Sequence, residues 1–174
     1  MKYLVKLFVV TFFLVFSTYA SAEQKIVVLD MKHVLNQSKA GKGAQDFLKK
    51  LFNSNSKKFA KAEKDLKKEE TDLLAKKNIL SDEDYKKKSN ELRKKVLKFQ
   101  TDRRTSLEEI AKLRAESREK LLNRIAPIVD TYIKENNISI VIDKKNMIGG
   151  LNEYDITKVI VAKLDKELPS LKLK

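Results

Sequence analysis

The chain of 174 residues contains no cysteine, no tryptophan and a single histidine. Without cysteine no disulfide can form, so stability has to come from packing or from association between chains. His33 is the only imidazole, and no base or nucleophile stands near it in the sequence, so we interpret it as a structural or surface residue. Spacings typical of metal ligands and glycine-rich phosphate loops are also missing. The sequence therefore predicts no enzyme, no cofactor and no metal site.

Residues that break helices are equally scarce, with four glycines and two prolines in the whole chain. Between Ala44 and Ile148 there is no glycine, and Pro127 is the only proline. Charged residues make up 36% of the chain and aromatic residues only 7%. This composition is too polar for an ordinary compact globule and fits a long helix or coiled coil, in which only a narrow seam is buried.

The N-terminus has the three parts of a secretory signal peptide. Lys2 and Lys6 are the positive region, residues 7–16 are apolar, and Ala20-Ser21-Ala22 fits the cleavage pattern. We therefore expect residues 1–22 to be removed between Ala22 and Glu23. The alternative is an uncleaved anchor, but the apolar stretch is shorter than the roughly 20 residues that a transmembrane helix needs. No cysteine follows the cleavage point, so lipid attachment there is excluded.

The balance of charge is strongly basic, with a net charge of +14, or +12 without Lys2 and Lys6. Such a balance indicates an anionic partner: nucleic acid, anionic lipid or acidic unfolded chains. The alternative is that the lysines only solvate an exposed helix. Export disfavours nucleic acid, and the runs 86–88 and 94–95 lack the interleaved aromatic residues that stack on bases. We therefore expect no nucleic-acid partner.

Two short β-branched runs, residues 25–30 and 138–143, predict β-strands. Asp30 and Asp143 end them and are interpreted as terminators or caps, a short third strand is expected around residues 147–148, and Asp155 should cap a closing helix from 156 to 168. Two or three strands are not stable alone, and their open edges favour pairing with other chains. The predicted class is α+β, with a β body (23–43 and 137–174) assembled between subunits. The oligomerisation residues expected on the two strands are Ile26, Val28, Leu29, Ile138, Ile140 and Ile142.

Residues 44–136 predict an antiparallel helical hairpin, with helices over 44–78 and 82–136 and a turn near 77–81. The glycines at 41 and 43 should let the chain change direction at its start, and Ser81 should cap the return helix through a capping box with Asp84. Pro127 should kink that helix. Heptad spacing places a seam on each helix. The seam on the first helix consists of Leu48, Phe52, Asn55, Phe59, Ala62, Leu66, Glu69 and Leu73. The seam on the return helix consists of Tyr85, Ser89, Leu92, Val96, Phe99, Arg103, Ser106, Ile110, Leu113, Ser117, Leu121, Ile125, Ile128 and Tyr132.

In ordered combination these features resemble the Skp/OmpH family of periplasmic chaperones. The matching parts are the signal peptide, the strand and helix over 25–38, residues 39–42 leading into the arm, the strand 137–143, and residues 155–157 leading into the last helix. The resemblance covers essentially the whole mature chain, although no single motif is highly specific. Pro127 departs from the family pattern at the base of the return helix.

The resemblance implies a homotrimer in the periplasm, with a β-barrel body and three helical arms that hold unfolded outer-membrane proteins without ATP. A lipopolysaccharide or anionic-lipid site is left open. A basic arm with scattered apolar side chains suggests that clients are bound by electrostatic attraction and by apolar contacts. Each aromatic residue can instead belong to the hairpin seam. A structural coiled-coil envelope protein that binds lipid or a folded partner is the alternative function. The candidate client-contacting residues are Phe47, Phe52, Phe59, Tyr85, Phe99, Lys86, Lys87, Lys94 and Lys95.

Overall fold

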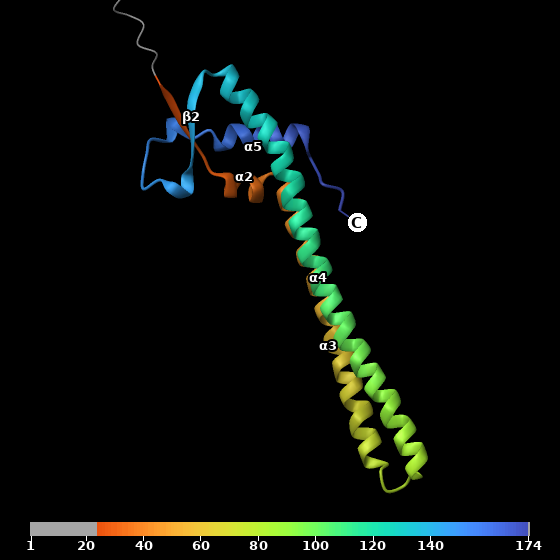
Figure 1. Cartoon of the computed structure of the whole chain (residues 1–174). Coiled ribbons are helices and arrows are strands. Elements are labelled where there is room, and N and C mark those ends of the chain that lie inside the picture. The colour runs from red at the N-terminus through yellow and green to blue at the C-terminus, as the bar shows by residue number, and fades with distance from the viewer. Residues whose placement is uncertain (1–23, 174) are drawn as a thin grey trace, which may run out of the picture.

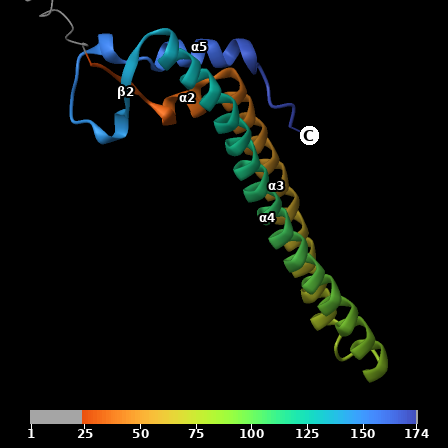
Figure 2. The same cartoon turned by 45° about the horizontal axis from the view of Figure 1, so that its top comes forward.

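The computed structural model describes residues 24–173, and in them a small body stands at one end of a long helical hairpin (Figure 1). The turned view in Figure 2 shows the same arrangement, with α3 and α4 side by side along the arm. Both ends of the hairpin return to the body. The elements in chain order are β1 (Lys25–Leu29), α2 (Met31–Gln37), α3 (Lys39–Ala75), α4 (Asp82–Glu135), β2 (Ile138–Asp143), the 3-10 helices η1 (Lys144–Asn146) and η2 (Asn152–Tyr154), and α5 (Thr157–Glu167).

The sheet has two parallel strands, and both strand predictions are confirmed. The register places Ile26 beside Ile140 and Val28 beside Ile142. The predicted third strand at residues 147–148 is wrong, because these residues lie between η1 and η2. An isolated bridge between Val28 and Asp155 instead extends β1 on its other side, where the carbonyl of Val28 accepts a hydrogen bond of 2.9 Å from the N–H of Ile156.

The core of the body lies where α2, α5 and the base of α4 cover one side of the sheet. Val34, Ile125, Ile160 and Leu164 are completely buried there. Leucine, isoleucine and valine side chains of this kind each contribute about 1.5–3 kcal/mol when they leave water. The widening apolar face of α4 after Leu121 supplies much of the cover.

The arm begins earlier than predicted, since α3 starts at Lys39 and contains both Gly41 and Gly43. The change of direction occurs at Ser38, whose extended backbone separates α2 from α3 and whose Oγ accepts a hydrogen bond of 3.2 Å from the N–H of Gly41. Gly41 serves a different purpose from the one predicted. A Cβ atom at this position would lie 1.9 Å from the carbonyl oxygen of Leu35. Glycine is therefore required for close packing between the helices.

The hairpin helices are long, because 37 residues in α3 and 54 in α4 correspond to roughly 55 and 80 Å at 1.5 Å per residue. The heptad seams are confirmed with two exceptions. Their members are buried or half-buried, but Phe52 and Arg103 are exposed.

At the tip the predicted Ser81 cap is present, with Oγ accepting a hydrogen bond of 3.1 Å from the N–H of Asp84. The reciprocal half of the capping box is absent from the described hydrogen bonds. The Ser81 hydroxyl instead donates to the Asp84 carboxylate at 2.6 Å.

Pro127 lies inside α4, and the helix continues on both sides of it from Asp82 to Glu135. A proline cannot donate to the carbonyl four residues earlier, so the helix lacks one backbone bond at its base. The predicted kink stays a prediction. Among residues 24–173, no helix combines the length and the apolar character that crossing a membrane requires.

Candidate functional site on the helical arm

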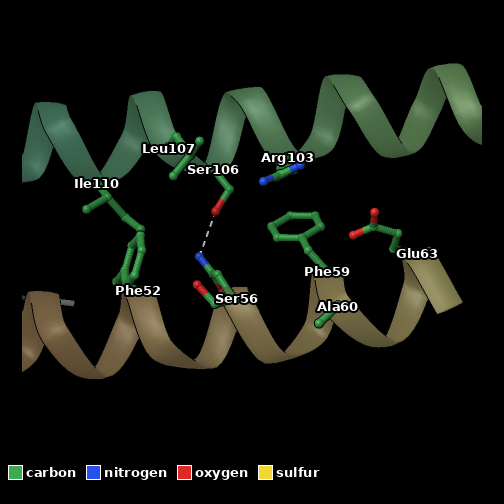
Figure 3. Close-up of a pocket in the computed structure, with 10 residues that line it drawn as sticks. Phe52, Ser56, Phe59, Ala60, Glu63, Arg103, Ser106, Leu107 and Ile110 are labelled. Atoms are coloured by element: carbon green, nitrogen blue, oxygen red, sulfur yellow. Dashed lines mark hydrogen bonds between the residues drawn. The ribbon is translucent and has the colours of Figure 1, made fainter.

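The middle of the arm carries a polar layer in place of an apolar one. Asn55 of α3 and Ser106 of α4 face each other across the seam, and the Asn55 amide donates a hydrogen bond of 2.7 Å to the Ser106 Oγ. Figure 3 draws this bond as the dashed line that ends at Ser106. Ser106 is buried, while Asn55 is half-buried. Both side chains are short, so they close the seam with less volume than a pair of leucines would fill. A groove opens over this layer on one side of the hairpin.

Apolar side chains flank the groove. Phe52 and Leu107 leave 48% and 49% of their surface exposed, although Phe52 occupies a heptad position that predicts burial. Ile110 is buried beside them, and Ser56 and Ala60 form a low rim on α3. Figure 3 shows Phe52 and Ile110 projecting from opposite helices into the space between them. The arrangement can accept a side chain from another molecule.

Phe59 closes the groove toward the tip and belongs to the seam. Its ring meets that of Phe99 edge to face, with centroids 6.0 Å apart and planes at 73°. Such a pair adds about 0.5–1.5 kcal/mol beyond its buried area. The ammonium group of Lys58 lies 5.9 Å from the centre of the Phe59 ring. Phe59 and Phe99 were candidates for client contact, and the structure uses most of their surface within the hairpin.

The remaining predicted contact residues are spread along the arm and do not converge on the groove. Phe47 and Tyr85 are half-buried near the base and the tip, respectively, while Lys86, Lys87 and Lys94 are exposed. Lys95, also exposed, forms an ion pair with Glu69 across the hairpin. Sequence reasoning missed Leu107, Ser56 and Ala60 because they lie beside the heptad seam. An apolar residue next to two polar seam positions is the signal that could have found Leu107.

Charge along the arm is positive overall. Residues 39–135 contain 27 lysines and arginines against 17 acids, a net charge of +10. Arg103 lines the groove and makes no ion pair within residues 24–173, while Glu63 is the only acid among the groove residues there. Positive potential of this kind favours acidic segments in a partner and weakens as salt is added.

The body offers a second apolar surface. Among the predicted oligomerisation residues, Val28, Leu29 and Ile138 are buried within their own chain, and Ile142 is half-buried. Ile26 and Ile140, neighbours in the parallel register, remain 40% and 47% exposed. Further large side chains are exposed in and near the loop between η1 and α5, namely Ile148, Leu151, Tyr154 and Val159. Only part of the predicted strand set is therefore free to meet another chain.

Asp155 joins the two ends of this loop by hydrogen bonds to Lys144, just after β2, and to Thr157. Its carboxylate accepts from the ammonium group of Lys144 at 2.7 Å and from the N–H of Thr157, the first residue of α5, at 2.9 Å. Burial alone would raise the pKa of Asp155, but the hydrogen bonds from Lys144 and Thr157 outweigh it and lower the pKa to about 2. The helix α5 begins at Thr157 with Ile156 at its N-cap, so the predicted cap position of Asp155 is wrong by one residue, although its carboxylate does accept from the N–H of Thr157. Asp30 and Asp143 are the caps of α2 and η1.

His33 lies on the exposed side of α2, and its backbone N–H donates a hydrogen bond of 2.7 Å to Asp30. Within residues 24–173, no three His, Cys, Asp or Glu side chains gather in a way that could hold a metal ion. The predicted cleavage point, Ala22 and Glu23, lies outside the described residues.

The family model described as "Outer membrane protein (OmpH-like)" matches residues 25–164, most of the chain. The chain belongs to the OmpH-like family. The resemblance drawn from the sequence is thereby confirmed, and membership in this family supports a chaperone role. No curated protein matches significantly.

Among solved structures, the fold of this OmpH-like protein is similar to a crystal structure of a candidate outer membrane chaperone (OmpH-like) from Caulobacter crescentus CB15. The TM-score is 0.80, and the alignment covers 90% of this chain and 93% of the other. The two sequences are only 17% identical. At this identity the match establishes the shared fold, a small body with a long hairpin.

Proposed function

We propose that this OmpH-like protein is an ATP-independent holdase that binds unfolded outer-membrane proteins between its basic arms and prevents their aggregation. The observation that carries the proposal is the hairpin itself. It projects from a small body, has a net charge of +10, and exposes isolated apolar side chains along its length. Many weak contacts of this kind suit a client without fixed structure, because such a client presents no single shape to recognise.

A homotrimer is proposed as the working form. The physical support is the two-stranded sheet, in which the register partners Ile26 and Ile140 both leave apolar side chains exposed. Two strands with such surface gain stability when another chain covers them. The family resemblance supplies the number three and the arrangement in which the arms surround a cavity.

The periplasm is the proposed location. The N-terminal pattern of Lys2, Lys6, the apolar stretch and Ala22 supports export, and the absence of cysteine is compatible with any redox state. Acidic clients released into this compartment would meet a basic arm. Anionic lipid or lipopolysaccharide remains a further candidate partner for the same charge.

A dilution assay tests the function directly. A urea-unfolded outer-membrane β-barrel protein is diluted into buffer with and without the mature protein, and light scattering is followed. We expect suppressed aggregation that saturates near one oligomer per client and weakens as salt is raised. Suppression that does not respond to salt would remove the electrostatic part of the proposal.

Unchanged aggregation in the presence of an intact oligomer would overturn the holdase function. It would favour the alternative of a structural coiled-coil protein of the envelope that binds lipid or a folded partner. The hairpin argues against a long tether, since both of its ends return to the body (Figure 1). Binding to anionic vesicles, measured by co-sedimentation, would then be the next experiment.

A further inference from the structure

We propose that the groove beside Asn55 and Ser106 is a receptor for one large apolar side chain of an extended polypeptide whose neighbouring residues are acidic. This inference rests on the proposed function and gives the arm one defined contact point. The principal contact residues are then Phe52 and Leu107, and not the Phe59 and Phe99 rings, which face each other inside the seam.

The first support is the exposure of Phe52 and Leu107. Each leaves about half of its surface in water, on opposite helices and on the same side of the hairpin. Phe52 would be covered if the seam followed the heptad at this layer. The side chains of Asn55 and Ser106 beside it are too small to fill the space between the helices, so the Phe52 ring is not covered. A guest side chain that lies between Phe52 and Leu107 would remove both surfaces from water.

The second support is the shape of the rim. Two of the α3 residues that line the groove, Ser56 and Ala60, are small. They leave the groove open on one side while Phe59 and Ile110 close it at its ends. Figure 3 shows this opening between the two helices. Its length, about two helical turns, suits one side chain of an extended chain and not a folded domain.

The third support is the charge around the groove. Arg103 lines it without an ion pair in residues 24–173, and the exposed ammonium group of Lys58 lies by the Phe59 ring. Glu63 opposes them with a single negative charge. The surrounding arm is positive, so an apolar residue between acidic neighbours is favoured over the same residue between basic ones.

Two matched pairs of variants test the groove. Leu107→Ser removes one wall, and Leu97→Ser makes the same change at a leucine of α4 that is 57% exposed and lies outside the groove. Ser56→Phe fills the groove from its rim, and Ser54→Phe adds the same ring to an exposed position of α3 outside it. Thermal unfolding of all four variants identifies any that lose the fold. Because Ser56→Phe adds apolar surface, it tests occupancy without removing a packing residue.

The probe is a short synthetic peptide with one fluorophenylalanine between aspartates, followed by fluorine NMR as the mature oligomer is added. We expect broadening or a shift with the wild-type protein and with both controls. Leu107→Ser and Ser56→Phe should weaken peptide binding by about fivefold to tenfold, the range that follows from losing a few tens of square ångströms of apolar contact. A peptide with lysines in place of the aspartates should bind more weakly than the acidic peptide.

No response of the peptide to the wild-type protein, or an equal response with Leu107→Ser and Leu97→Ser, would overturn the groove assignment. The dilution assay reports separately on the holdase function. A peptide response that depends on Leu107, with no suppression of aggregation, would retain the groove and reject the holdase. Suppression of aggregation without a peptide response would retain the holdase function and reject the groove.

Discussion

Asn55 and Ser106 share a hydrogen bond of 2.7 Å across the middle of the hairpin, where both helices would otherwise place apolar side chains. The bond satisfies a buried hydroxyl, so the layer is not a defect. It divides the seam into an apolar part toward the body and another toward the tip. The arm is therefore held less tightly at its centre than at its base, where Leu121 and Ile125 are buried.

Replacing both partners should stiffen the arm. In the double variant Asn55→Leu with Ser106→Ala, we expect hairpin stability to rise by about 1 kcal/mol or more, because apolar contact replaces a hydrogen bond of small net value. Asn55→Ala alone should lower it by about 1 kcal/mol. Amide hydrogen exchange in α3 and α4 measures both effects. If the double variant exchanges as fast as Asn55→Ala, the layer is not the weak point of the seam.

Gly41 and Gly43 provide a second, internally controlled prediction. A Cβ at Gly41 would collide with the carbonyl oxygen of Leu35, whereas a Cβ at Gly43 would meet nothing within 4 Å. Gly41→Ala should therefore lower the free energy of unfolding by several kcal/mol, since backbone atoms have to move. Gly43→Ala should raise it by about 0.5–1 kcal/mol through helix propensity. Urea unfolding of the two variants gives the comparison, and equal effects of the two alanines would show that α2 and α3 do not pack as described.

Ser81→Ala tests the tip of the arm. The Ser81 side chain satisfies the N–H of Asp84 at the start of α4, and its loss should lower local stability by about 1 kcal/mol. Hydrogen exchange should quicken in the first turns of α4 and stay unchanged in the body. Ser54→Ala, in the exposed interior of α3, is the control and should slow local exchange slightly. Faster exchange at the tip in both variants would assign the effect to the loss of a hydroxyl in general.

The arm could be predicted from the sequence because its structure is periodic. The heptad register of Leu48, Leu73 and Ile110 depends only on spacing along each helix, and these positions are buried as expected. The heptad position of Phe52 predicts burial, but Phe52 is exposed because of the Asn55–Ser106 layer beside it. That layer forms between two helices, and the spacing of residues along one helix does not predict which residues of the other helix it meets. Leu107 lies beside the seam, so the heptad pattern makes no prediction for it.

The start of the arm and the third strand were mispredicted for a different physical reason. Glycine is ordinarily a sign of a turn, but at Gly41 it permits close approach of two helices, and only the tertiary contact with Leu35 distinguishes the two uses. The apolar pair Met147-Ile148 has the composition of a strand. The available side of β1 is taken by Asp155 and Ile156, so no edge in the described chain remains for it there. Both outcomes depend on which distant segments meet.

Asp155 gives the last prediction, a dependence of stability on pH. Its carboxylate has a pKa near 3.8 in the unfolded chain and about 2 in the folded one. Because the folded pKa is the lower of the two, its contribution is fully present above pH 4 and is lost as the pH falls through about 2. Asp155→Asn should therefore cost about 1–2 kcal/mol at pH 7, and its difference from the wild type should shrink as the pH falls from about 4 to 2. Asp130→Asn makes the same change at an exposed position of α4 and is the control variant. Urea unfolding measured across this pH range checks both variants, and a constant penalty for Asp155→Asn would indicate lost packing in place of the charged bond to Lys144.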